Sequence, residues 1–178
     1  MRVEGVVEAT QRWVAQCVVG RDLCPFAKGL LESDRLAIRV AEGPQLEALL
    51  YELAAEARRL GQLEPGELET SLVVHPQALA EFEAQLDFLP AVEGVLEELG
   101  LQEVLQVVSF HPDYRFEDAP ADDPANYTNR SPFAMFHLLR RASVEGAVAG
   151  YSDPDSIWRR NVDTLRELGA DTLEAELT

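Results

Sequence analysis

Cys24 lies in a local sequence that favours a reactive side chain. It precedes Pro25 in the segment LCPFAKGLL, where proline suits the first position of a short helix and Cys24 suits the N-cap. There its sulfur would lie beside unpaired backbone N–H groups and the positive end of the helix dipole, which both favour the thiolate. Cys24 is therefore a candidate nucleophile or metal ligand, with an inert buried thiol as the alternative. Cys17, on an apolar helix face, is expected to be inert.

Two predicted strands end in the same dipeptide, His75-Pro76 and His111-Pro112. In a parallel sheet the C-terminal ends of the strands lie along one edge, where open α/β folds bind ligands. Proline also ends a strand simply because it lacks the N–H group that the ladder needs. We favour this structural explanation for His75. For His111 we favour a role in a site, where Asp113 could orient the imidazole or complete a metal site.

A polar stretch, DDPANYTNRSPFAMFHLLRR, occupies residues 122–141. Ser131 followed by Pro132 is typical of a helix start, so we expect a helix over residues 132–142. A helix N-terminus beside the guanidinium of Arg130 would bind a phosphate or carboxylate, because the dipole and the fixed donors both favour negative charge. The sequence thus predicts an anion-binding helix N-terminus.

His137 and Arg140 are three residues apart within this expected helix and would share a face near the site. Arg130 could instead form a structural ion pair with Asp122 or Asp123. The residues predicted to bind the substrate are Tyr114, Asn126, Thr128, Asn129, Arg130, Ser131 and Arg140.

Size and charge limit the classes of function. The 178 residues suggest one domain, residues 1–178, and the formal net charge of −17 argues against nucleic acid or an anionic membrane surface as a partner. No apolar run approaches the ~20 residues that span a bilayer. The segment MRVEGVVEATQRW lacks the apolar core of a signal peptide. We therefore expect a cytoplasmic protein that acts on a small anionic molecule.

The apolar pattern predicts helices that alternate with three strands. Strands are expected at residues 35–42, 69–76 and 104–112, the first near a sheet edge and the third in the centre. Helices are expected at residues 5–19, after Pro25, at 44–60, at 77–99 with a break or kink at Pro90, at 132–142, and from Pro154 with fraying after Gly169.

This alternation favours an α/β fold with a small three-stranded, largely parallel sheet flanked by about six helices. An α+β sandwich with one antiparallel strand is the alternative. Residues 112–131 form a long polar loop, and a loop of this length in a compact domain is usually functional or disordered. We expect it to line a site.

Four segments of the chain resemble one protein family. They are LCPFA, QVVSFHPDYRF, DDPANYTNRSP and FHLLRRAS, and their order and spacing resemble the bacterial family catalogued as domain of unknown function 1415. The resemblance spans nearly the whole chain and implies no established activity, cofactor or partner. Arg141 stands where an acidic residue is more usual. The motif positions are Cys24, Pro25, Phe26, His111, Pro112, Tyr114, Asn126, Thr128, Asn129, Arg130, Ser131, Pro132, His137 and Arg140.

Three functions are compatible with these residues. In the first, an enzyme, Cys24, His111 and His137 form a reactive cluster. Either Cys24 is a nucleophile with His111 as general base and Asp113 as orienting group, or the three side chains hold a divalent metal such as zinc or iron with an open position. The second is a non-catalytic protein that binds a small anion or a metal, and the third is a purely structural polar loop. The chain contains no HExxH, GxSxG, Walker or GxGxxG motif.

Overall fold

A computed structural model describes residues 2–149, 153 and 155–177, and the structural statements below concern these residues. The chain forms a four-stranded sheet in the order β1-β2-β4-β3. β1 and β2 are parallel, whereas β4 is antiparallel to both β2 and β3. The fold is therefore mixed α/β. The strands are β1 (Leu36–Val40), β2 (Thr70–Val74), β3 (Leu105–Phe110) and β4 (Met135–Arg140).

β4 corrects the expectation of three largely parallel strands and of a helix over residues 132–142. This segment is a strand that inserts between β2 and β3, so that β3 lies at an edge of the sheet and not in its centre. A short apolar run fits a buried strand and a buried helix equally well, because it has no polar face. Pairing on both sides satisfies the backbone groups of β4, and this tertiary contribution decides for the strand.

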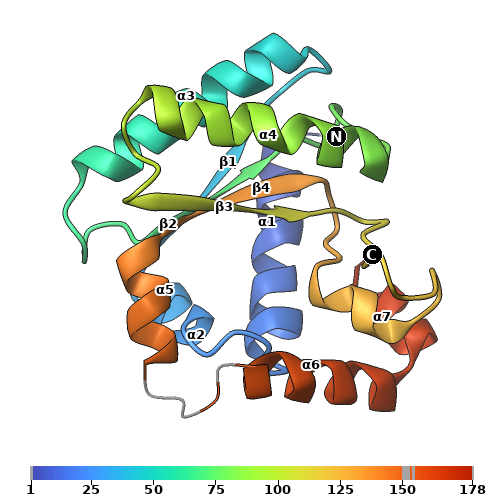
Figure 1. Cartoon of the computed structure of the whole chain (residues 1–178). Coiled ribbons are helices and arrows are strands. Elements are labelled where there is room, and N and C mark those ends of the chain that lie inside the picture. The colour runs from blue at the N-terminus through green and yellow to red at the C-terminus, as the bar shows by residue number, and fades with distance from the viewer. Residues whose placement is uncertain (1, 150–152, 154, 178) are drawn as a thin grey trace.

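Helices cover both faces of the sheet, as Figure 1 shows. α3 (Leu46–Gln62) and α4 (Phe82–Glu98) pack on one face, where Val73 and Phe136 belong to a closed apolar cluster. A second cluster lies on the opposite face and includes Leu72. That face is covered by α1 (Val3–Trp13), the π-helix η1 (Val14–Val19), α2 (Ala27–Glu32), α5 (Arg141–Val148), α6 (Asp155–Leu168) and α7 (Ala170–Glu176).

Pro90 does not break the helix in which it lies, so of the two predicted outcomes, a break or a kink, the break is wrong. α4 runs through it without interruption, and the helix begins at Phe82, later than the predicted residue 77. A proline removes the hydrogen bond to the carbonyl four residues earlier, which belongs to Leu86. Leu86 is 42% exposed, so water can hydrogen-bond to that carbonyl in place of the missing N–H.

The C-terminal part of the chain also differs from the sequence prediction. Pro154, the expected first residue of the last helix, lies outside the described residues. Trp158, expected on the inner face of α6, is 51% exposed. α7 forms where fraying was expected after Gly169, because Leu173 is buried in the apolar cluster of this face. No helix within the described residues is both long and apolar enough to cross a membrane.

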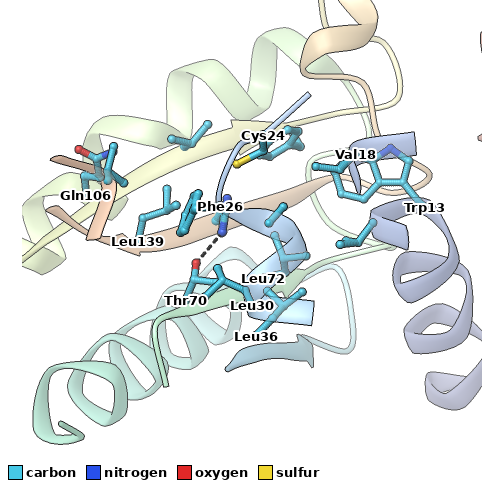
Figure 2. Close-up of a pocket in the computed structure, with 16 residues that line it drawn as sticks. Trp13, Val18, Cys24, Phe26, Leu30, Leu36, Thr70, Leu72, Gln106 and Leu139 are labelled. Carbon is cyan, nitrogen blue, oxygen red and sulfur yellow. Dashed lines mark hydrogen bonds between the residues drawn. The ribbon is translucent and has the colours of Figure 1, made fainter. Parts of the chain in front are cut away.

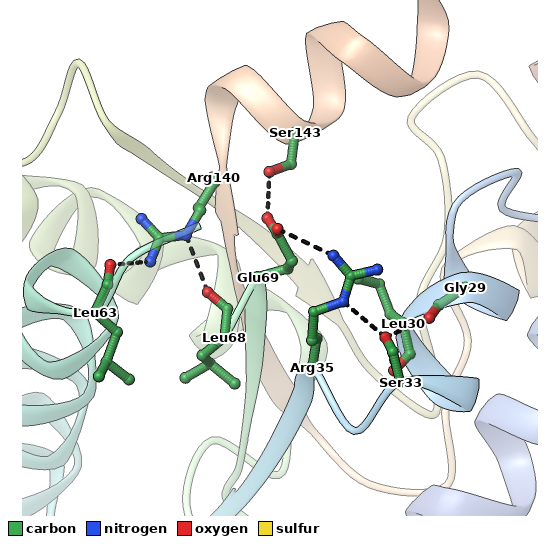
Figure 3. Close-up of polar contacts among 9 residues, drawn as sticks. All are labelled: Gly29, Leu30, Ser33, Arg35, Leu63, Leu68, Glu69, Arg140 and Ser143. Carbon is green, nitrogen blue, oxygen red and sulfur yellow. Dashed lines mark hydrogen bonds and ion pairs between the residues drawn. The ribbon is translucent and has the colours of Figure 1, made fainter. Parts of the chain in front are cut away.

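Arg140, predicted to bind substrate, is a buried structural residue at the end of β4. Its Nε donates to the carbonyl of Leu68 at 3.0 Å, and its Nη2 donates to the carbonyls of Leu60 and Leu63 at 2.7 and 2.6 Å. Figure 3 shows the guanidinium between Leu63 and Leu68, with the Glu69 carboxylate bound separately by Ser143 and Arg35. A cation suits this place, because the last carbonyls of α3 carry the negative end of the helix dipole.

We predict that Arg140→Met lowers the free energy of unfolding by about 3 kcal/mol or more, because three carbonyls lose a charged donor and two of these bonds are buried. Arg141→Met is the matched control. Arg141 is exposed and donates to the carbonyl of Gln102, so its loss is expected to cost less than about 1 kcal/mol. Urea unfolding followed by circular dichroism measures both values. Equal destabilisation by the two variants would contradict the structural role of Arg140.

Candidate functional site

A cavity of about 260 Å³ lies on the sheet face that α1 and α2 cover. Figure 2 shows the residues around it. They come from all four strands, from α1, η1, α2 and α5, and from the segment that leads into α2. Its lining is apolar apart from a few polar groups, chiefly Cys24, Thr70, Gln106 and His137. The full set is Trp13, Val14, Val18, Cys24, Phe26, Ala27, Leu30, Leu36, Thr70, Leu72, Gln106, Val108, Phe110, His137, Leu139 and Val144. We call it the first cavity.

The position of His137 in the sheet follows from the register of β4. His137 pairs with Leu72 of β2 and Val108 of β3, so its side chain points from the middle of the sheet to the first cavity. Its Nε2 lies 2.6 Å from Oγ1 of Thr70, and that hydroxyl donates to the carbonyl of Leu138 at 2.7 Å. Because a hydroxyl has one hydrogen, Nε2 must carry the proton in the bond to Thr70.

This hydrogen bond fixes the tautomer and leaves the lone pair of Nδ1 as an acceptor. Among the described residues, Thr70 is the hydrogen-bond partner that the structure gives this ring. Burial away from water lowers the pKa of His137 to about 4, because the charged form loses its hydration. At neutral pH the cavity therefore presents an uncharged imidazole that accepts, and does not donate, a hydrogen bond at Nδ1.

Cys24 lies in the wall of the first cavity but does not carry the thiolate that its sequence position suggested. α2 begins at Ala27 with Phe26 as its N-cap, so Cys24, the predicted cap, lies two residues before the observed one. Burial raises the pKa of the thiol, and the carboxylate of Asp22 raises it further. The backbone N–H groups of Phe26 and Ala27 bond to the sulfur and oppose this, but burial is the larger effect.

His111 is separated from the other two members of the predicted cluster. It is buried on the α4 side of the sheet end, where its ring packs against Phe82. Its Nδ1 accepts a bond from the backbone N–H of Asp113, so Nε2 carries the proton and donates to the carbonyl of Leu79 at 3.2 Å. Leu79 has a left-handed φ of 51°, which a leucine rarely adopts. His111 therefore stabilises a strained turn, and its contact with Asp113 involves the backbone and not the carboxylate.

The metal site predicted from Cys24, His111 and His137 is not formed. His137 and Cys24 line the first cavity, while both ring nitrogens of His111 are engaged elsewhere. Within the part of the chain that the structure describes, no group of three His, Cys, Asp or Glu side chains could hold a metal ion.

The predicted anion cradle around Arg130 is also arranged differently. No helix begins at Ser131, whose hydroxyl donates to the carbonyl of Phe133 at 2.7 Å. The guanidinium of Arg130 donates to the carbonyls of Tyr114 and Ala121 at 3.0 and 2.8 Å and stacks over the ring of Tyr127. Its partners are thus loop carbonyls, and not Asp122 or Asp123.

The remaining polar residues of this loop also bond to its own backbone. Asn126 is fully buried, accepts from the N–H of Phe116 and donates to the carbonyl of Pro120. Thr128 donates to the carbonyl of Ala125, within the 3₁₀-helix η2 (Pro124–Thr128). These bonds replace the regular partners that a long loop lacks.

Thr128 and Asn129 nevertheless meet Cys24 at a second cavity of about 190 Å³. This second cavity adjoins the first, because Trp13, Val18, Cys24 and Phe110 line both. Its other lining residues are Cys17, Leu23, Tyr127, Thr128 and Asn129. The structure thus brings together Cys24 with Thr128 and Asn129, and Cys24 with His137, while Arg130, Ser131 and His111 lie outside both cavities.

The family model described as "Protein of unknown function (DUF1415)" matches residues 5–175. The chain belongs to the DUF1415 family. The resemblance seen in the sequence is therefore confirmed over nearly its whole length. No curated protein and no solved structure matched the chain. We infer the chemistry of this DUF1415 protein from the first and second cavities, because they adjoin and share Cys24.

Sequence reasoning missed Trp13 and Thr70 as site residues of this DUF1415 protein. Trp13 follows the apolar spacing of an ordinary core helix, and nothing local distinguishes it. Thr70 and Ser71 begin a strand that is otherwise apolar, which is a weak signal for a polar role. The pairing of Thr70 with His137 spans 67 positions, so no local pattern could reveal it.

The thiol of Cys24 is predicted to react slowly with iodoacetamide at neutral pH, because its raised pKa keeps it protonated. In a Cys17→Ala background the alkylation rate should still be rising with pH at the pKa of an ordinary thiol, about 8.5. Mass spectrometry of the alkylated protein measures this rate. A rate that reaches its plateau near neutral pH would instead reveal a thiolate.

The buried imidazole of His75 predicts a pH dependence of stability. Burial lowers its pKa to about 4, the bond of its ring to the carbonyl of Ala78 opposes this, and nearby His111 lowers it further. Between about pH 6.5 and pH 4 the unfolded chain binds a proton that the folded chain does not, so stability falls as the pH falls through this window. The contribution of His75 is on the order of 3 kcal/mol, fully present above about pH 6.5.

Urea unfolding of the wild type and of His75→Asn, at about pH 7 and about pH 4.5, tests this dependence. The amide nitrogen of asparagine can replace Nδ1 in the bond to Ala78 without titrating. The variant should lose less stability than the wild type on acidification. The same loss in both proteins would show that His75 does not titrate as proposed.

Proposed function

We propose that this protein binds a small, neutral, mostly apolar molecule that carries one hydroxyl or N–H group. The observation that carries the proposal is the first cavity, a mostly apolar space that is lined by His137, whose Nδ1 is a free acceptor, and by the amide of Gln106. Ligand sites are commonly apolar hollows with a few polar groups that fix orientation. Here the Thr70 hydroxyl fixes the orientation of the imidazole, because it accepts a hydrogen bond from Nε2 of His137. Nδ1 is thereby left to bind and orient the ligand.

Volume limits the size of the ligand. An apolar cavity of roughly 150 Å³ holds benzene. The first cavity has about 260 Å³, which suits an aromatic ring with a short alkyl substituent. Burial of such a molecule would contribute roughly 25 cal/mol for each Å² of apolar surface removed from water.

Charge favours a neutral ligand over the anion expected from the sequence. No Lys or Arg side chain lines either cavity among the described residues. An unpaired charge in an apolar cavity is strongly disfavoured, because it loses its hydration without gaining a counter-ion. The lone pair of Nδ1 would also repel a carboxylate. A hydroxyl or N–H group instead gains a bond and leaves no buried group unpaired.

A second candidate function is catalysis on the bound molecule. It is favoured by one observation, that Cys24 and His137 both line the first cavity. Nδ1 could accept the proton of a ligand hydroxyl as a general base. A pKa of about 4 makes His137 a weak base in the empty site, and the thiol of Cys24 is protonated, so binding without turnover is the conclusion that we prefer. Turnover of a bound phenol that disappears in Cys24→Ala would reverse this preference.

The binding proposal is tested with a matched pair of probes, 4-propylphenol and 4-propylanisole. They share the apolar body, but the methyl ether cannot donate a hydrogen bond. Isothermal titration calorimetry should show the phenol binding about tenfold more tightly, as expected for one neutral hydrogen bond in a sheltered site. In His137→Phe this preference should disappear.

Trp158→Phe is the control, because this residue is exposed on α6 and lines neither cavity. It should bind both probes as the wild type does. The proposal fails if the wild type binds neither probe, or if His137→Phe keeps the preference for the phenol.

A further inference from the structure

The indole N–H of Trp13 is a buried donor for which the described structure offers no acceptor. Trp13 is 4% exposed and packs edge-on against Phe110, with ring centroids 5.5 Å apart. Buried polar groups in folded proteins are nearly always hydrogen-bonded, so an unpaired N–H of this kind calls for a partner from outside the chain. Tryptophan donates through this single group and cannot satisfy it by rotation.

The place of Trp13 between the two cavities indicates what that partner is. Figure 2 shows the six-membered ring directed along the first cavity, with the nitrogen on another edge of the indole. Trp13 also lines the second cavity, together with the polar residues Thr128 and Asn129. The π-helix η1 begins directly after Trp13 and carries Val18 into the same shared wall. Single π-helical turns often mark functional sites.

We propose that the second cavity holds the far end of the same ligand, and that this end carries a neutral hydrogen-bond acceptor for Nε1–H of Trp13. The inference rests on the proposed function of the first cavity and narrows its ligand class. The ligand is an elongated apolar molecule with a donor at one end, for Nδ1 of His137, and a carbonyl or ether oxygen at the other. The acceptor is neutral because neither cavity is lined by Lys or Arg in the described part of the chain.

Two phenols of matched length test this subsite, 4-(4-hydroxyphenyl)butan-2-one and 4-butylphenol. Both offer the hydroxyl donor, and only the first offers a carbonyl acceptor at the far end. In the wild type the ketone should bind roughly five- to tenfold more tightly, the gain of one sheltered hydrogen bond. In Trp13→Phe, which keeps an aromatic ring but removes the N–H, the ketone should bind no more tightly than 4-butylphenol. Because Trp13 lines both cavities, the substitution also changes their packing, so the ratio of the two affinities, and not either affinity alone, is the measured quantity.

A second measurement needs no substitution. The chain has two tryptophans, and Trp158 is exposed on α6. In ¹H–¹⁵N spectra the indole signal of Trp13 should move downfield with the ketone but not with 4-butylphenol, while the signal of Trp158 stays unchanged.

The outcomes separate the two proposals. If the wild type binds both phenols equally and the Trp13 signal does not distinguish them, the subsite is disproved and the first cavity remains a binding site. If Trp13→Phe weakens both phenols alike, Trp13 contributes packing and not a hydrogen bond, and the subsite is also disproved. If neither phenol binds, the proposed function fails together with the subsite.

Discussion

The insertion of β4 between β2 and β3 is the constraint on which the site depends. Hydrogen bonding on both sides fixes the register of β4, and a shift by one residue would move every side chain to the other face. This register aligns Leu72, His137 and Val108 across the sheet and brings His137 against Thr70. The tautomer of the imidazole and the acceptor that faces the first cavity both follow from that pairing.

The two faces of the sheet consequently differ in character. The face under α3 and α4 contains a large apolar core, with His75 and His111 buried at the end of the sheet. The face under α1, η1 and α2 contains the first and second cavities. Three histidines thus differ by the face on which they lie. His137 lines a cavity, whereas His75 and His111 are buried against backbone carbonyls.

The long loop between β3 and β4 shows the same principle for the polar residues. Asn126, Arg130 and Ser131 bond to the loop's own carbonyl and N–H groups, which have no strand or long helix to pair with. The loop thereby acquires a fixed shape, and it places Thr128 and Asn129 at the second cavity. The hydrogen bonds of these polar side chains satisfy backbone groups that have no regular partner.

The sequence by itself determined the family, through the order and spacing of its motifs. It also determined the positions of β1, β2 and β3, the edge position of β1 and the amphipathic helices α1 and α3, since each of these follows from a local pattern of apolar side chains. It also identified Cys24 and His137 as candidates, although it placed His137 on a helix and grouped both with His111. Only the tertiary structure decided that residues 135–140 form a strand, which face each histidine occupies, and that Trp13 and Thr70 join the site. The physical reason is that these outcomes depend on hydrogen bonds and burial between segments far apart in the chain, whereas a local pattern reports only the preferences of neighbouring residues.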